Sequence, residues 1–500
     1  MTRDPEPMSL LTIILAPMPV LLAMGLLAAR RSSIEAGLAG AALGAGLALA
    51  GGLPGAVLAD AALRSLWIAW MAVSVILAGL VFDAVASPVR GSAWTDAAAT
   101  TAGPDDRRYR RIFTACMLIG PFAESATGFG VGAVVTAALL RGEGLGGARA
   151  AVLALLSQLL VPWGALAIGT QVTAVLMRHD PHQLGAAAAA VSAIAYAGGL
   201  VVLRLQLAAV GIRPRRRDRL IDPPLVAGLI VALVVANLFL GPETAALAAL
   251  GLPIAIDLGV RRRDVAIRTT TRILAPYLAL TLVLLVTRLV TPLAEALRHW
   301  IWQPVDGLPG YAPLHHPAGW LLATAVVAAL MAGNRPGRIG HDIARGLGHG
   351  IRPAAATIAF VLLAGVWAAG GAPTVLAAAW RDVAAGADLA IIPPLAGLAG
   401  FLTGSNVAVA AMIAPLADAL PGMGADGGGA GALMALLIAA MLLVVGGLAT
   451  MVSPMRLAMA AALTGAAASD EAAIRRRSTP LPVAVALLLG LAAAVAGLLG

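Results

Sequence analysis

The chain has 500 residues, of which 60% are hydrophobic and only 12% are charged, and its formal net charge is +9. Soluble globular domains carry about 25% charged residues, and apolar stretches long enough to cross a bilayer recur here from end to end, so a large soluble domain is excluded. The single cysteine excludes an internal disulfide and a CxxC motif.

The apolar stretches predict an all-α polytopic membrane protein with about 12–14 membrane segments. In chain order they lie near residues 8–29, 34–51, 66–86, 112–140, 149–177, 184–204, 224–241, 243–259, 273–291, 318–333, 353–370, 389–416, 430–469 and 483–500. Four of these segments contain polar, glycine or proline interruptions: 112–140, 149–177, 389–416 and 430–469. We expect two membrane halves, residues 1–259 and 260–500.

The connecting segments carry three further expectations. Residues 87–111 are polar and predict a surface linker with a short helix. The proline-rich segment 292–317 predicts an external loop, whose His315-His316 pair we interpret as solvated rather than as a metal site. Residues 335–352 predict an amphipathic helix at the cytoplasmic interface.

Arginine clusters predict the topology. They lie at 107–111, 213–219, 261–272, 335–352 and 475–477. Because cytoplasmic loops are enriched in arginine, the clusters should share one side of the membrane. They do so only if 112–140 is a re-entrant hairpin from the cytoplasmic face and 389–416 is one from the opposite face, which places both termini outside. Re-entrant backbone is tolerated where protein or a water-filled cavity covers it. The arginines therefore indicate membrane topology, and no nucleic-acid partner is expected.

The interruptions form two similar pairs. Residues 120–132 read GPFAESATGFGVG, and the later broken helix 149–177 contains Pro162-Trp163-Gly164. Residues 401–415 read FLTGSNVAVAAMIAP, and the later broken helix 430–469 contains Gly446-Gly447 and Ser453-Pro454. Paired interruptions in two inverted repeats are typical of a transporter site at the membrane midplane. Close packing of small residues between helices is the alternative interpretation.

The two hairpin tips are candidate anion sites. A broken helix exposes backbone N–H groups at the start of its second half, and these groups together with the helix dipole attract an anion. No arginine lies near either tip in the sequence, so we expect backbone and neutral side chains to bind it. Gln171, in the broken fifth segment, could line the same cavity or only satisfy freed backbone groups. The substrate-binding candidates are Ser125, Thr127, Gly128, Phe129, Gly130, Gln171, Thr403, Gly404, Ser405 and Asn406.

Glu124 is the candidate proton-coupling residue. A charge near the bilayer centre costs roughly 3 kcal/mol, so a carboxyl group there favours its protonated form. A nearby substrate anion would favour that form further, and proton and anion binding would then assist each other. The alternative is an ionised Glu124 that accepts hydrogen bonds from backbone N–H groups and stabilises the hairpin.

Three segments resemble the lactate permease family. GPFAESATGFGVGAVVTAALL resembles its signature around the glutamate, FLTGSNVAVAAMIAPL resembles its GSN segment, and MVSPMRLAMAAALTG resembles its C-terminal region. The order and spacing agree over roughly residues 60–480. The resemblance implies proton symport of lactate or glycolate, both 2-hydroxy acids, across a bacterial inner membrane. It also implies kinship with inverted-repeat ion transporters.

Departures from the family pattern leave the substrate and the coupling ion open. The first tip is more polar than the family's because of Ser125 and Thr127, whereas an apolar run follows Asn406. A different small organic anion, or sodium coupling through the oxygens of Ser405 and Asn406, is therefore the alternative. We expect no enzyme activity, no cofactor and no metal centre. The expected partners are the carboxylate, protons or sodium, and the lipid bilayer, with a homodimer as an open alternative.

Overall fold

The computed structural model describes residues 10–99, 107–260, 265–384, 387–420 and 429–499. Within these ranges the secondary structure is helical, apart from one isolated antiparallel bridge between Trp302 and Tyr311. The described residues contain 9 helices long and apolar enough to cross a membrane, and a tenth if the bent pair Ile273–Leu289 and Thr291–Arg298 counts as one span. The protein is therefore an α-helical multi-pass membrane protein.

The first half begins with α1 (Leu10–Leu15), α2 (Met18–Ala28), α3 (Ser33–Ala50), α4 (Gly55–Ala99), α5 (Arg108–Thr114), a π-helical turn (Ala115–Ile119), α6 (Gly120–Thr127) and α7 (Val131–Gly142). It continues with α8 (Gly147–Leu155), a 3₁₀ helix (Leu156–Trp163), α9 (Gly164–Leu176), α10 (Pro181–Ala208), α11 (Arg216–Leu240) and α12 (Pro242–Val260).

The second half begins with α13 (Val265–Leu289), α14 (Thr291–Arg298), α15 (Pro317–Met331), α16 (Pro336–Ala369), α17 (Ala372–Ala384) and a 3₁₀ turn (Asp388–Ile391). It continues with α18 (Ile392–Thr403), α19 (Asn406–Ala419), α20 (Gly429–Thr450), α21 (Pro454–Thr464), a 3₁₀ turn (Ala468–Asp470), α22 (Glu471–Ser478) and α23 (Pro480–Leu499).

Helices occupy each predicted apolar segment, but two predictions about the connections are wrong. The expected surface linker 87–111, with only a short helix, is helical over residues 87–99, where α4 continues to Ala99, and again from Arg108; residues 100–106 lie outside the described residues. The expected interfacial helix 335–352 and the span 353–370 are one helix, α16, which continues through Pro353. Small residues explain this continuity: a Cβ on Gly346 would lie 2.6 Å from Cα of Val81, so α16 packs directly along α4. That tertiary packing offsets the single hydrogen bond lost at a proline.

The outer surface of the helices is apolar. Large side chains such as Leu205, Phe239 and Leu487 are 62%, 78% and 63% exposed. A soluble protein would bury most of such a surface, whereas a bilayer solvates it. The broken segment Gly147–Leu176 is different, because 94% of its apolar window is buried inside the protein. The helix interruptions of the first half therefore lie in the protein core rather than against lipid.

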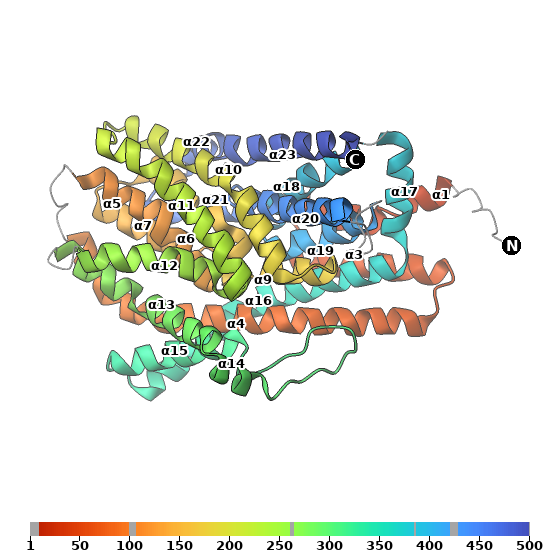
Figure 1. Ribbon diagram of the computed structural model, residues 1–500, viewed down its shortest axis with the longest axis horizontal. Coiled ribbons are helices and arrows are strands. Elements are labelled where there is room, and N and C mark those ends of the chain that lie inside the picture. The colour runs from red at the N-terminus through yellow and green to blue at the C-terminus, as the bar shows by residue number, and fades with distance from the viewer. Residues whose placement is uncertain (1–9, 100–106, 261–264, 385–386, 421–428, 500) are drawn as a thin grey trace.

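Figure 1 shows how the basic segments are distributed along the long axis. The helices α5 and α22, the junction of α10 with α11 and the start of α16 lie toward the left, whereas α1 and the end of α23 lie toward the right. This separation agrees with the distribution that the arginine clusters predicted. The entry of the two hairpins from opposite membrane faces, and the inverted repeat itself, stay predictions.

Candidate functional site

The first tip, residues 128–130, reverses the chain between α6 and α7. Gly128, Phe129 and Gly130 have φ values of 71°, 55° and 90°. Glycine adopts these left-handed angles freely, whereas phenylalanine does not. Space also requires glycine here, since a Cβ on Gly128 would lie 2.8 Å from Cβ of Ala165. The GFG sequence therefore forms a tight turn against a neighbouring element.

The carboxylate of Glu124 binds the start of α7. It is 2% exposed, and its oxygens accept hydrogen bonds from the N–H of Gly130 at 3.1 Å and the N–H of Gly132 at 3.0 Å. These are N–H groups that a helix leaves free at its first turn. The contacts are those of the alternative interpretation, in which an ionised Glu124 stabilises the hairpin. They also show that this helix start binds a carboxylate.

Arg456 is the candidate site residue that the sequence analysis missed. Its Nη1 lies 3.4 Å from Oε1 of Glu124, in a pair whose side chains are 7% and 2% exposed. The expectation that no arginine lies near either tip is therefore wrong. The two residues are 332 positions apart, so local inspection could not connect them. One signal was available: Arg456 is the only ionisable residue in the apolar run 430–469, and such residues mark functional sites in membranes.

The second tip, residues 404–406, connects α18 and α19 by a simpler geometry. Gly404 has a φ of 64° and ends α18, and the hydroxyl of Ser405 caps α19 by accepting a hydrogen bond from the N–H of Ala408 at 3.4 Å. Asn406 is 7% exposed, yet both polar atoms of its amide lack a hydrogen-bond partner within the described residues. A buried, unsatisfied amide is costly, which makes Asn406 a candidate ligand-binding group.

The structure contains a break in each of the predicted broken helices, 149–177 and 430–469, but not at every position where one was expected. The first break follows the 3₁₀ helix Leu156–Trp163, where Ala165, Leu166 and Ala167 adopt left-handed φ values of 49°, 54° and 60°. Left-handed backbone costs about 1–2 kcal/mol per residue and concentrates at functional sites. The second break lies at residues 451–453, between α20 and α21.

The predicted interruption at Gly446-Gly447 is wrong, because both residues lie inside α20. They permit close packing instead. A Cβ on Gly446 would lie 2.5 Å from Cγ1 of Val409, and one on Gly447 would lie 3.1 Å from Cδ of Pro162. At these two positions the small residues act as the packing alternative predicted.

Each tip contacts both broken helices. The first tip lies against Ala165 of the first break, and a Cβ on Gly130 would lie 2.8 Å from Nη1 of Arg456 on α21. The second tip lies against the second break, where a Cβ on Gly404 would be 3.0 Å from Oγ of Ser453. Its Asn406 lies against α9, with Nδ2 3.0 Å from a Cβ on Gly169. The candidate site is therefore assembled from both halves of the chain.

Three predicted hydroxyl groups donate to their own helices. Ser125, Thr127 and Thr403 donate hydrogen bonds to the carbonyl oxygens four residues earlier, at 2.8, 3.0 and 2.7 Å. Because each hydroxyl has only one donor, these three side chains can now only accept further hydrogen bonds, and an anion needs donors. Among the predicted side chains of the two tips, the amide of Asn406 and the hydroxyl of Ser405 keep donors without a hydrogen-bond partner in the described part of the chain.

Gln171 lies in a different place from the tips. It lines a cavity of about 150 Å³ together with Glu243 and His316, and its amide donates to Oε1 of Glu243 at 3.4 Å. Arg288 donates to the other oxygen of Glu243 at 3.0 Å. Gln171 thus belongs to a polar cluster beside the loop 299–316, apart from the Glu124–Arg456 pair.

Ion pairs hold the base of the first hairpin. Arg111, just before the π-helical turn, donates to Oε2 of Glu143 at 2.8 Å, which joins the outer ends of the two arms. Asp222, fully buried on α11, accepts hydrogen bonds from Tyr109 at 2.7 Å, Arg110 at 2.8 Å and Arg204 at 3.1 Å. The segment from α5 to α7 is therefore held at both ends, by these ion pairs near Arg111 and Glu143 and by the hydrogen bonds of Glu124 at the first tip.

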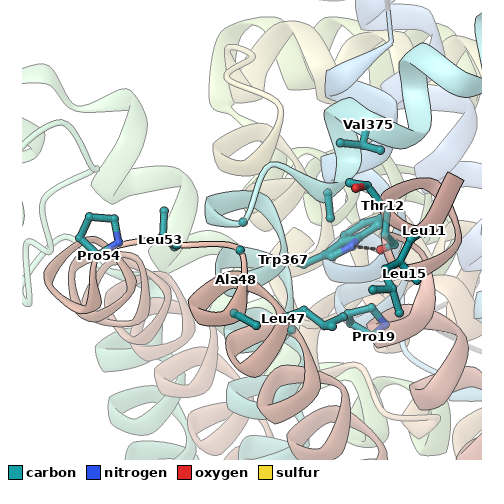
Figure 2. A pocket seen from close by; sticks show the side chains of 17 residues that line it. Leu11, Thr12, Leu15, Pro19, Leu47, Ala48, Leu53, Pro54, Trp367 and Val375 are labelled. Atoms are coloured by element: carbon teal, nitrogen blue, oxygen red, sulfur yellow. Dashed lines mark hydrogen bonds between the residues drawn. The ribbon is translucent and has the colours of Figure 1, made fainter. Parts of the chain in front are cut away.

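The largest of the described cavities lies elsewhere. It has a volume of about 720 Å³ and is formed by α1, α2, α3, α16 and the start of α17 (Figure 2). Figure 2 shows the indole of Trp367 in its wall, donating to the carbonyl oxygen of Ala16 at 2.8 Å. That bond satisfies a backbone group freed by the break between α1 and α2. None of the predicted site residues lines this cavity.

Comparison with known proteins adds no relative. Neither a protein-family model nor a curated protein matches the chain. The resemblance to the lactate permeases therefore depends on the three segments quoted above.

Proposed function

We propose that the chain is a secondary active transporter, rather than an enzyme, for small monocarboxylates of the lactate or glycolate type. Transport would proceed by alternating access with proton symport, in the inner membrane of a bacterium. The observation that carries the proposal is the buried Glu124–Arg456 pair, which joins the two halves of the chain beside two interrupted helices.

The geometry supports a binding site at this location for three reasons. Membrane proteins retain ionisable groups in their core where those groups bind substrate or carry protons. Interrupted helices expose backbone donors only where protein or a cavity covers them. The buried amide of Asn406, without a partner among the described residues, adds a donor and an acceptor on the opposite hairpin.

Uptake into proteoliposomes tests the proposal. The purified protein would be reconstituted and supplied with labelled carboxylates of two to six carbons under separate proton and sodium gradients. We expect accumulation of a short carboxylate driven by an inward proton gradient at fixed sodium. Glu124→Gln should abolish this proton-driven accumulation, whereas the exposed control Glu295→Gln should retain it. Proton-driven accumulation by Glu124→Gln equal to that of the wild type would disprove the coupling role.

Sodium coupling is the second candidate, and one observation favours it. Oδ1 of Asn406 is a buried oxygen without a partner in the described part of the chain, and hard cations such as sodium prefer oxygen ligands. Accumulation driven by a sodium gradient at constant pH, and lost in Asn406→Ala, would establish this candidate in place of proton symport.

A further inference from the structure

The donors around Glu124 form a complete carboxylate site. They comprise the N–H groups of Gly130 and Gly132 at the start of α7, and the guanidinium of Arg456 from the other half. Helix N-termini and guanidinium groups are the two protein features that bind carboxylates best. Glu124 occupies this site with a carboxylate of its own, so the structure displays how an anion of this class would be held.

Arg456 has donor capacity that Glu124 does not use. It is 6% exposed, its closest contact with Glu124 is a single one at 3.4 Å, and its Nε has no hydrogen-bond partner within the described ranges. A guanidinium has five N–H donors and usually binds a carboxylate through two of them at shorter distances. A buried arginine paired so incompletely is suited to exchange its partner for another carboxylate.

We propose that the substrate carboxylate binds in the place of the Glu124 carboxylate, on Arg456 and the N–H groups of Gly130 and Gly132, after Glu124 accepts a proton. This inference rests on the proposed function and names the group that recognises the substrate. The proton comes from water and binds a carboxylate oxygen of Glu124. The protonated side chain leaves the three donors, and the substrate anion replaces it without a change in the net charge of the site.

Charge balance explains how this exchange couples the two fluxes. Ionised Glu124 with Arg456 is a neutral pair, and protonated Glu124 with a bound anion on Arg456 is neutral as well. Two mixed states are not neutral. Protonated Glu124 without a bound anion leaves an unpaired guanidinium, and ionised Glu124 with a bound anion places two carboxylates beside one guanidinium. Unpaired charges in a dry core are strongly unfavourable. Only the empty, ionised site and the site loaded with proton and anion are therefore stable in the closed protein, which is the requirement for symport.

Other ionisable groups on the surrounding helices do not replace this pair. From Gly164 to Leu176, α9 has none, and on α7 the only one is Arg141 at the far end. The elements packed against α6 and α21 carry these further ionisable residues: Asp60, Arg64, Asp83, Arg90 and Asp96 on α4, Cys116 in the π-helical turn, Arg149 on α8, Glu243 and Asp257 on α12, and Glu471, Arg475, Arg476 and Arg477 on α22. Among the described residues, the Glu124 carboxylate contacts the N–H groups of Gly130 and Gly132 and the guanidinium of Arg456.

Equilibrium binding at two pH values tests the exchange. Binding of labelled L-lactate, and of the carboxylate best transported by the wild type, would be measured on purified protein at pH 5.5 and pH 8. Wild-type binding should be tighter at the lower pH. Glu124→Gln leaves the donors free at every pH, so it should bind equally well at both, as tightly as the wild type at pH 5.5. Arg456→Gln should weaken binding by about ten- to a hundredfold at both pH values, the range for a lost charged hydrogen bond.

Two further variants keep the test valid if a single substitution impairs folding. The double variant Glu124→Gln/Arg456→Gln removes both charges and should fold while binding no carboxylate. Arg456→Lys keeps the charge and should recover part of the affinity. Replacement of the exposed Arg338 by glutamine is the matched control and should bind as the wild type does.

The outcomes separate this inference from the proposed function. Wild-type affinity in Arg456→Gln, wild-type pH dependence in Glu124→Gln, or no carboxylate binding by the wild type at either pH would overturn the exchange. If proteoliposomes accumulate the carboxylate while Arg456→Gln keeps its KM, the exchange fails and transport stands. If binding follows the expected pattern but no carboxylate accumulates, transport fails and the binding site stands.

Discussion

Glu124 and Arg456 show how much one contact can change the meaning of a residue. In the sequence, Glu124 is a carboxylate in an apolar segment, for which protonation is the simplest way to lower the cost of burial. In the structure it also has two backbone N–H donors and a guanidinium. Removing one member of a buried ion pair costs about 3–5 kcal/mol because the other charge remains. The same pair is thus a structural connection between the two halves and the centre of the proposed exchange.

Gly130 provides a test at the scale of one residue. Gly130→Ala would place a Cβ 2.8 Å from Nη1 of Arg456 and 2.6 Å from Cε of Met459, at a φ of 90°. We expect lost uptake and a loss of stability of about 2–4 kcal/mol, from left-handed strain of about 1–2 kcal/mol plus the displaced side chains. Thermal unfolding and uptake measure the two effects.

Gly333→Ala is the matched control for this substitution. Gly333 also has a positive φ, of 79°, but no atom lies within 4 Å of its Cβ position. It should therefore show the backbone strain alone and retain uptake. Equal loss of uptake in both variants would mean that the contact with Arg456 is irrelevant.

At the scale of elements, helix interruptions were predictable from glycine and proline, but their geometry was not. The left-handed turn at Ala165, Leu166 and Ala167 contains no glycine, so no local preference indicates it. It forms where the first tip packs against the break, with Gly128 against Ala165. Conversely, Gly446-Gly447 continues α20 because packing against Val409 and Pro162 uses the small residues. Tertiary contacts decide between these outcomes.

The start of α15 provides a test at this scale. His316 caps that helix by accepting a hydrogen bond from the N–H of Ala318 at 3.4 Å. Burial lowers the pKa of His316 from 6.5 to about 4, because the charged form loses solvation. The carboxylate of Glu243 opposes this lowering, and the guanidinium of Arg288 adds to it. A charge there would also oppose the helix dipole. The folded state therefore binds this proton more weakly than the unfolded state.

The sign of the pH dependence follows from this depressed pKa. The stabilisation is fully present above pH 6.5 and decreases as the pH falls toward 4, by an amount on the order of 3 kcal/mol. Replacing His316 by asparagine keeps a capping side chain without a titrating ring, so it should reduce this decrease. Burial also lowers the pKa of His315 to about 4, so His315 accounts for the decrease in stability that remains in the His316→Asn variant. Thermal unfolding of the wild type and the variant between pH 7.5 and 4.5 measures this decrease in stability. An unchanged pH profile would contradict the assignment.

At the scale of the whole molecule, the proposed transport cycle requires the two halves to move relative to each other. Besides Glu124 and Arg456, two further ion pairs among the described residues join them. Arg288 on α13 pairs with Glu243 on α12, and Arg178 after α9 donates to Oδ2 of Asp418 on α19 at 2.8 Å. This pair is more exposed, at 64% and 19% for the two side chains. In alternating access, α9 would separate from α19 at the Arg178–Asp418 contact each time the site opens to the side of the membrane where this contact lies.

Cross-linking tests that movement. In the double variant Arg178→Cys/Asp418→Cys, a bifunctional thiol reagent should join α9 to α19 and abolish uptake, whereas a monofunctional reagent should have a much smaller effect. The two single cysteine variants serve as controls. The only native cysteine, Cys116, is fully buried, so its background reaction is small. Full uptake after complete cross-linking would show that these helices do not separate during transport.

The sequence alone determined the helical membrane class, the positions of the apolar helices and the interrupted segments, because hydropathy and glycine or proline content act locally. It also singled out Glu124 as a carboxylate in an apolar segment. Only the tertiary structure decided what Glu124 contacts, that Gln171 lies in another cluster, and that Asn406 stays unpaired among the described residues. The reason is physical: the carboxylate site is made by groups 332 residues apart, and only packing of the two halves brings them together.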